Sequence, residues 1–248
     1  MALDHTPWLR RFLPGKRQAV PARAESHIRG LSQERTLPED HILYLRRLKQ
    51  EGFEPKVVYD IGACVLHWTT EAKKVWPDAQ YVLFDAFEPA QFLYDESGCA
   101  YHIGVLSDRD GREVGFYQND WMPTGSSYYR EIGSPDHAVL FPRGSARPRI
   151  TRSLDSVVTE RGLPSPDFVK MDVQGSELDI VMGGLQTLAS ADRMILELQH
   201  SDYNEGAPKR DQVIRALQPL GWRCSAPLFS CNGPDGDYGF ERALAQSP

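Results

Sequence analysis

The chain has 248 residues, a formal net charge of −6, and a composition of 41% hydrophobic and 25% charged residues. Such a chain is typical of one globular α/β domain with a substantial core. The negative charge argues against nucleic acid or an anionic membrane as a partner, and no apolar run is long enough to span a membrane. Four cysteines lack C-x-x-C spacing, which argues against a zinc site and predicts free thiols in the cytoplasm: Cys64, Cys99, Cys224 and Cys231.

Residues 1–35 form an arginine-rich arm before the domain, which we expect to cover residues 36–248. Three prolines interrupt the arm, so a loosely ordered segment is one interpretation. The other is docking on the domain, or on a second copy in a homodimer, through Trp8, Leu9, Phe12 and Leu13. From Thr36 the order Thr-Leu-Pro-Glu is a capping-box pattern, which predicts a helix that ends near Gly52.

A strand, an acid and a glycine turn follow one another in residues 56–70. An apolar run predicts a buried strand that ends at Asp60, Gly62 and Ala63 make a tight turn, and residues 68–76 have a helical pattern. In open α/β sheets the crevice beyond such a strand binds ligands. The G-x-G-x-x-G pattern of a dinucleotide site is absent, and Asp60 would repel a pyrophosphate. The sulfonium and amino group of S-adenosylmethionine suit this acid better.

The second predicted strand, residues 80–84, is also followed by acids. An acid at this place typically accepts hydrogen bonds from ribose hydroxyls. Two residues compete for the role, Asp85 and Glu88. We favour Glu88 and keep Asp85 as the alternative.

A third strand is predicted over residues 101–106, and it ends at Ser107 and Asp108. Its position at the same edge of the sheet would bring Asp108 to the adenine amino group. An Asp-Gly pair then predicts a hairpin turn into a returning strand over residues 113–117.

Residues 118–150 have no clear periodicity but carry Trp121, Tyr128 and Tyr129. A long aromatic loop in a compact domain is often functional, so we assign these side chains to the substrate side. An ordinary surface insertion is the alternative.

A second acidic strand tip lies further along the chain. Residues 168–171 predict a strand ending at Asp172, with Lys170 inside it as a structural ion-pair partner, and residues 177–188 predict a helix. The strands and helices around this motif alternate: helix 153–161, strand 193–198, helix 211–220 and an antiparallel pair, 222–229 with 237–242. This order predicts one doubly wound α/β domain in which both acidic tips open on the same crevice.

Four blocks resemble a known family: Asp60-Ile61-Gly62-Ala63, Phe87-Glu88-Pro89, Ser153-Leu154-Asp155-Ser156, and Lys170 to Glu177 with the order KMDVQGSE. Together they resemble the FkbM family of S-adenosylmethionine-dependent methyltransferases. The resemblance implies a Rossmann-like, mostly parallel seven-stranded sheet with the last-but-one strand at its edge, and methyl transfer usually to a hydroxyl. We expect the cofactor to be bound by Asp60, Gly62, Ala63, Asp85, Glu88, Ser107, Asp108 and Asp172. Cys64 and Leu66 stand where the family usually has Asn and Gly, and the bulk of Leu66 predicts a narrowed approach to the methionine portion.

A hydroxyl nucleophile gains from a general base within hydrogen-bond reach. By intrinsic pKa the best base near the strand tips is His200, with His67 as a second candidate and Asp172 as a further one. Gln174 and Glu177 are assigned to the substrate side, although an acid such as Glu177 also suits a helix start. We predict no metal site, because the carboxylates that follow His200 form only a weak ligand pattern.

The sequence therefore predicts O-methylation of a hydroxyl on a small-molecule or sugar-containing natural product. A catalytically silent fold that binds a ligand or partner is the alternative, and a nicotinamide dehydrogenase is a poor third for want of glycines. The sequence does not identify the methyl acceptor, nor does it decide whether the nucleophilic atom is oxygen or nitrogen.

Overall fold

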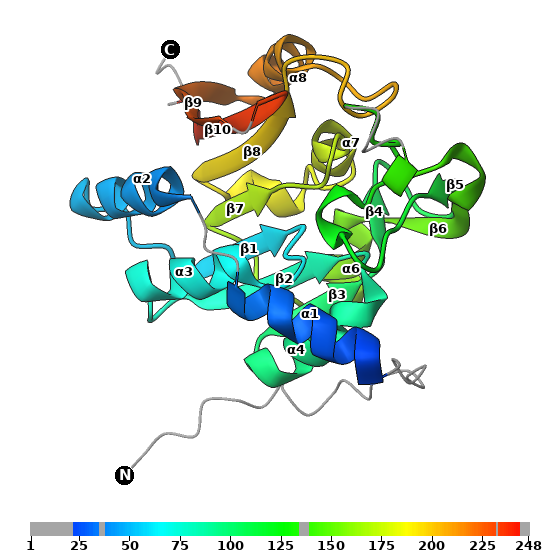
Figure 1. The fold of residues 1–248 in the computed structure, drawn as a ribbon. Helices are drawn as coiled ribbons and strands as arrows, with labels where there is room; N and C mark the ends of the chain where they lie inside the picture. Colours follow the sequence, from blue (N-terminus) through cyan, green and yellow to red (C-terminus); the bar gives the residue numbers. More distant parts are fainter. Residues whose placement is uncertain (1–21, 35–37, 134–138, 232, 244–248) are drawn as a thin grey trace.

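The computed structural model describes residues 22–34, 38–133, 139–231 and 233–243. Its centre is a seven-stranded sheet in the order β3–β2–β1–β7–β8–β10–β9 (Figure 1). These strands are β1 (Val57–Ile61), β2 (Gln80–Asp85), β3 (Ala100–Ile103), β7 (Phe168–Met171), β8 (Arg193–Gln199), β9 (Trp222–Cys231) and β10 (Asp235–Arg242). Neighbours are parallel except where β10 pairs with β8 and β9. The edge strand β9 is the last but one, so the predicted fold is confirmed.

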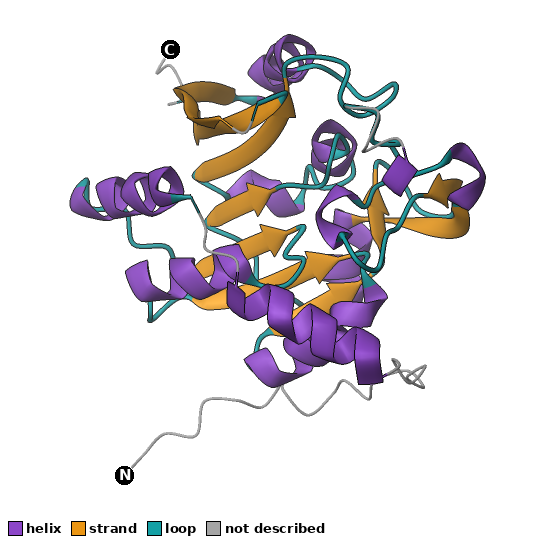
Figure 2. Cartoon of the chain, in the orientation of Figure 1, coloured by secondary structure: helices purple, strands orange, loops and turns teal. Residues whose placement is uncertain are grey.

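Helices cover both faces of this sheet (Figure 2). One face carries α1 (Ala22–Glu34), α2 (Glu39–Gln50), α3 (His67–Val75) and α4 (Gln91–Ser97), and the other carries α6 (Leu154–Arg161), α7 (Glu177–Met182) and α8 (Arg210–Leu217). Short 3-10 helices lie at Glu88–Ala90, Pro123–Gly125, Arg143–Ser145, Thr187–Ser190 and Gln218–Leu220. Each face has its own apolar cluster, as a doubly wound sheet requires.

Alternation along β1 decides where its acid lies. Tyr59 and Ile61 belong to the cluster under α6 and α7, while Val58 belongs to the cluster under α2 and α3. Side chains alternate along a strand, so Asp60 shares the face of Val58. The parallel register sets Asp60 directly opposite Lys170 of β7. The two side chains therefore meet inside the protein.

The predicted strand over residues 101–106 is in fact two strands. The extended segment is interrupted at Gly104. Before it lies β3, in the large sheet, and after it lies β4 (Val105–Ser107), in a separate sheet with the order β4–β6–β5. The predicted hairpin is wrong: β5 (Glu113–Phe116) pairs antiparallel with β6 (Arg147–Ser153), which begins inside the segment predicted as a loop, residues 118–150. The sequence did not predict β6, because its arginines interrupt the apolar pattern of a strand.

Two further elements differ from expectation. The predicted helix over residues 177–188 ends at Met182, because Gly183 and Gly184 follow, and Leu185 is 42% exposed rather than buried. Within the predicted arm, residues 22–34 form α1, whose Ile28 is fully buried against the domain. The four apolar residues proposed for docking, 8, 9, 12 and 13, lie outside the described residues. Among the described helices, none is both long and apolar enough to cross a membrane.

Candidate active site

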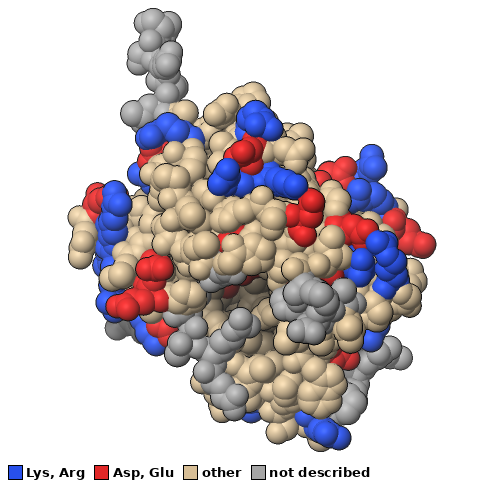
Figure 3. Space-filling view, turned by 45° about the horizontal axis from the view of Figure 1, so that its top comes forward, with Lys and Arg blue, Asp and Glu red and all other residues tan. Residues whose placement is uncertain are grey.

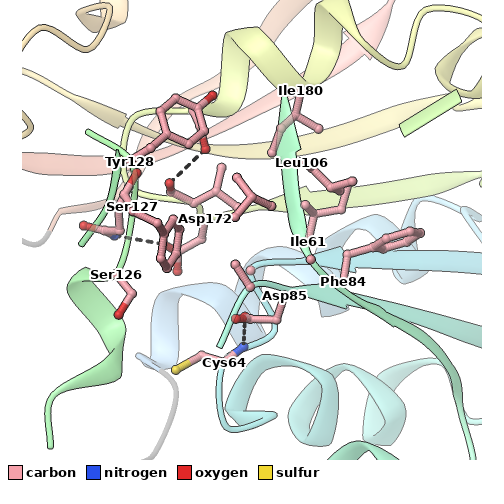
Figure 4. Close-up of a pocket in the computed structure, with 18 of the residues that line it drawn as sticks. Ile61, Cys64, Phe84, Asp85, Leu106, Ser126, Ser127, Tyr128, Asp172 and Ile180 are labelled. Carbon is pink, nitrogen blue, oxygen red and sulfur yellow. Dashed lines mark hydrogen bonds between the residues drawn. The ribbon is translucent and has the colours of Figure 1, made fainter. Parts of the chain in front are cut away.

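A pocket opens at the carboxyl ends of β1, β2 and β7, the crevice predicted from the strand tips (Figure 4). It holds about 650 Å³ of empty space with its open mouth included. Its apolar wall comprises Ile61, Phe84, Val105, Leu106, Phe116, Val173 and Ile180. Its polar lining includes Asp85, Thr124, Ser126, Ser127, Tyr128, Asp172, Gln174 and Ser176. Figure 3 shows a hollow in one face of the molecule, with acidic atoms inside it.

Asp85, the last residue of β2, lines the pocket. Its two carboxylate oxygens accept hydrogen bonds from the backbone N–H of Cys64, at 2.6 Å, and of Phe87, at 2.7 Å. Burial raises the pKa of Asp85 above its usual value, although these amide donors oppose the rise. The side chain of Glu88, by contrast, is 55% exposed and forms an ion pair with Arg149 outside the pocket. Of the two predicted ribose acids, only Asp85 faces the pocket.

Asp172 lines the pocket from the end of β7. Its Oδ1 accepts a hydrogen bond from Nε2 of Gln174 at 3.0 Å, and its Oδ2 lies 3.5 Å from Nζ of Lys170. Burial alone would raise the pKa of Asp172, but the charge of Lys170 and the hydrogen bonds to this carboxylate outweigh it and lower the pKa. Asp172 is therefore ionised at neutral pH.

Glu197 of β8 is a partner of Asp172 that the sequence interpretation missed. Nε2 of Gln174 also donates to Oε2 of Glu197, at 2.6 Å, so the amide links the two acids. Burial, followed by the charge of Asp172, raises the pKa of Glu197 well above its usual value. Burial and the charge of Asp172 thus favour the protonated form of Glu197 beside the pocket. The signal in the sequence was a lone charge among the apolar residues 194–198.

Asp60 lies beneath the pocket rather than in it, which corrects the expectation that its carboxylate meets the cofactor. The side chain is fully buried, accepts a hydrogen bond from Oγ1 of Thr69 at 2.5 Å, and lies 3.4 Å from Nζ of Lys170. Lys170 is the structural ion-pair partner that was predicted, and its Nζ also donates to the carbonyl of Gly62. Asp60 therefore stabilises the turn after β1 indirectly, because it pairs with the lysine that binds the carbonyl of Gly62.

The turn after β1 depends on backbone geometry. Gly62 lines the pocket with φ of +79°, and a Cβ there would collide with the carbonyl oxygen of Asp172. Ala63 packs in the core instead of lining the pocket. Leu66 has φ of 68°, a left-handed conformation that favours glycine, but it also lies outside the pocket lining. The narrowing of the approach to the methionine portion by Leu66 therefore stays a prediction.

Ser107 is the last residue of β4 and Asp108 follows it, and neither lines the pocket, although Leu106 does. Ser107 is fully buried, and its Oγ accepts a hydrogen bond from Nη2 of Arg112 at 2.5 Å. Asp108 faces the same guanidinium at 3.4 Å. Ser107, by a hydrogen bond, and Asp108, by an ion pair, thus both bind Arg112 beside the pocket.

The three aromatic residues of the predicted substrate loop lie in different places. Tyr128 lines the pocket and donates to Oδ2 of Asp179 at 2.7 Å. Tyr129 donates to the same atom at 3.0 Å but does not line the pocket. Trp121 lines a different pocket. The loop therefore does reach the cofactor-side crevice, through residues 123–128.

Glu177 braces the loop after β7. It is almost fully buried, and its Oε1 accepts hydrogen bonds from the backbone N–H of Val173, at 3.0 Å, and of Gly175, at 3.3 Å. Burial raises the pKa of Glu177 to about 7. Gln174 lines the pocket within this loop, whereas Glu177 acts on the loop from its helix.

The predicted base His200 lies away from the pocket. Its Nε2 is 2.8 Å from the hydroxyl of Tyr238, and burial together with Arg210 lowers its pKa. His67 lines the other pocket, with Nε2 at 2.8 Å from the carbonyl oxygen of Leu31. Within the described ranges no group of three or more His, Cys, Asp or Glu side chains is arranged to hold a metal ion.

The strand order and the pocket at the carboxyl ends of β1, β2 and β7 define the class I methyltransferase fold. Residues 60–224 match the family described as "Methyltransferase FkbM domain", and the chain belongs to this family. Methyltransferases of this family use S-adenosylmethionine, as the sequence blocks indicated. The pocket fits this cofactor, because it combines two carboxylates with an apolar wall.

Similar proteins are related to only part of this chain or at low identity. The 2-O-methyltransferase NoeI of Sinorhizobium fredii is 41% identical over 56 residues, which are 23% of this chain and 23% of that protein. Magnesium protoporphyrin IX methyltransferase of Synechocystis PCC 6803, with bound S-adenosylmethionine, is 11% identical, with 90% of this chain and 92% of that chain covered and a TM-score of 0.47. TomG of Streptomyces achromogenes is 10% identical, with 93% and 92% covered and a TM-score of 0.46.

Proposed function

We propose that this chain transfers a methyl group from S-adenosylmethionine to a hydroxyl oxygen of a small-molecule or sugar-containing natural product. The pocket carries the proposal, because it has an acid at the tip of β2, Asp85, and another at the tip of β7, Asp172. The partial similarity to a 2-O-methyltransferase supports oxygen as the nucleophile.

Asp85 is the residue that we assign to the ribose. Its orientation is fixed by two backbone donors, and a carboxylate oxygen has a further lone pair to accept a hydroxyl proton. Glu88 points to Arg149 and is left without this role. The apolar side chains of Phe84 and Leu106 offer the adenine a surface to pack on.

We assign two roles to Asp172. Its negative charge stabilises the cationic methionine portion, and its carboxylate, which stays ionised, is the group that we assign to accept the proton of the acceptor hydroxyl. The cofactor supplies a methyl group on a positively charged sulfur, which is a good leaving group. Asp172 would take up the proton that the hydroxyl loses on methylation, and most of the remaining rate enhancement would come from alignment of the acceptor with the cofactor.

The catalytically silent alternative was motivated by Leu66 and Cys64, which stand where the family usually has Gly and Asn. Leu66 lies outside the pocket lining, whereas Cys64 lines the pocket. The left-handed backbone at Cys64 and Leu66 is the conformation that Asn and Gly favour, so the loop keeps its path with different side chains.

Methyl transfer from tritiated S-adenosylmethionine to a panel of glycosides and phenols tests the proposal. We expect a product whose NMR spectrum has a methyl ether, and we expect Asp172→Asn to lower kcat by about 10²-fold or more, because general-base catalysis contributes about that much. Asp202→Asn is the matched control, since Asp202 is exposed and pairs with Lys209. A methylated nitrogen would contradict the proposal, as would full activity in Asp172→Asn.

A further inference from the structure

A second pocket adjoins the first and has a different chemical character. It is lined by Leu31, Val65, His67, Trp121, Met122, Pro123 and Thr124. Pro123 and Thr124 line both pockets, so the two compartments are neighbours across one turn of chain. None of the described lining residues of the second pocket is acidic, whereas the first has Asp85 and Asp172.

Helix α1 forms one wall of this pocket and is fastened to the domain. Ile28 is fully buried, and Arg29 forms an ion pair with Glu96 of α4 and lies over the ring of Phe92. The carbonyl oxygen of Leu31 lies 2.8 Å from Nε2 of His67, which joins α1 to the start of α3. The wall is therefore part of the folded domain.

The opposite wall is also held in place. Oδ1 of Asn119 accepts hydrogen bonds from the backbone N–H of Trp121, at 2.9 Å, and of Met122, at 3.1 Å. The Trp121 ring lies 4.6 Å from the ring of His27, and Arg23 lies 5.5 Å from its centroid. Trp121 is nonetheless 56% exposed and Met122 is 43% exposed. Two large apolar side chains in fixed positions with exposed surface are typical of a binding site.

We propose that the second pocket binds an alkyl or aryl group of the methyl acceptor, while the hydroxyl-bearing part of the same molecule occupies the first pocket near Asp172. This rests on the proposed function, because the acceptor must reach the cofactor through the first pocket. Pro123 and Thr124 line both pockets, so one molecule of the acceptor that passes this turn would contact both compartments. The substrate class is a hydroxyl compound with an apolar substituent rather than a free sugar.

Titration calorimetry on the full chain saturated with S-adenosylhomocysteine tests the subsite. The probes are n-octyl β-D-glucoside, below its micellar concentration, and methyl β-D-glucoside. Each buried methylene contributes roughly fourfold in affinity, so we expect the octyl compound to bind at least about tenfold more tightly. Leu31→Trp should fill the pocket and remove this preference, and Leu31→Met, of similar volume, should keep it.

A second filling variant, Met122→Trp, guards against a misfolded Leu31→Trp, since Met122 is already exposed. Equal affinity for the two glucosides would overturn the subsite, as would an octyl preference that survives in both filled variants. The initial titration with S-adenosylhomocysteine separates the two proposals. If it gives no heat, the cofactor-dependent function fails; if it gives heat without an octyl preference, only the subsite fails.

Discussion

The carboxylate of Asp60 is buried against a lysine rather than exposed to a ligand. Asp60 and Lys170 face each other across β1 and β7, and both side chains are at most 5% exposed. Burial alone would lower the pKa of Lys170, but the carboxylates of Asp60 and Asp172 raise it, so the ammonium stays charged. Removing one member of such a pair leaves an uncompensated charge in the interior.

We therefore expect Asp60→Asn to lower the free energy of unfolding by about 3–5 kcal/mol, and Lys170→Met to do the same. The double variant should lose less than the sum of the two, because it removes both members of the buried Asp60–Lys170 pair together. Urea denaturation followed by circular dichroism measures all three. Additive losses would show that the two side chains do not interact.

Asp85→Asn should weaken S-adenosylhomocysteine binding by roughly 10–100-fold. A hydrogen bond to a charged group contributes about 1.5–3 kcal/mol, and Asn keeps the shape of the side chain without its charge. Glu88→Gln is the control, since Glu88 lies outside the pocket and should change the affinity less than about twofold. If calorimetry showed that Glu88→Gln weakens S-adenosylhomocysteine binding more than Asp85→Asn does, Glu88 rather than Asp85 would be the residue that binds the ribose.

Glu177 makes stability depend on pH. Its pKa is about 7 in the folded chain against 4.5 for an ordinary glutamate, so between these values the folded state holds a proton that the unfolded state has lost. The stability from this group is complete below pH 4.5 and is lost as pH rises through about 7. Glu177→Gln keeps the hydrogen-bond acceptor and stays neutral. The unfolding free energy of the wild type minus that of the variant should fall by up to ~3 kcal/mol between pH 4.5 and 8, and a constant difference would contradict this.

At the scale of elements, the sequence predicted what depends on neighbours along the chain and missed what depends on distant partners. The strands β1 and β7 are predicted by apolar runs that are followed by an acid and a glycine. The pairing of β5 with β6 joins Glu113 to Ile150, and no local pattern indicates a partner at that distance. The sequence interpretation did not predict helix α1, because the arginines and prolines of residues 1–35 indicated an arm rather than a helix.

The loop that leads from β1 into α3 carries a conformational cost. Leu66 adopts a left-handed conformation, which costs a non-glycine residue roughly 1–2 kcal/mol. We expect Leu66→Gly to recover part of this cost while it loses some packing, so that the unfolding free energy changes by less than about 1 kcal/mol. S-adenosylhomocysteine affinity should stay within about twofold, because Leu66 does not line the pocket. A gain of tenfold or more would show that Leu66 obstructs the cofactor.

At the scale of the whole molecule, the order of the strands gathers residues that are far apart in the chain. Parallel β1, β2 and β7 end at one edge, which brings Gly62, Asp85 and Asp172 to one pocket. The sequence identified these three residues because each directly follows or ends a strand. It also nominated Glu88 and His200, which lie elsewhere, because distance along the chain from a strand tip does not fix the direction of a side chain.

Hydrogen–deuterium exchange with and without S-adenosylhomocysteine tests the location of the cofactor most directly. We expect added protection in peptides that cover residues 62–64, 85–87, 104–106 and 172–176, which line or support the pocket. Peptides around His200 and Tyr238, outside the pocket, should be unchanged. Protection confined to that second region, or absent from the strand tips at saturating ligand, would contradict the account.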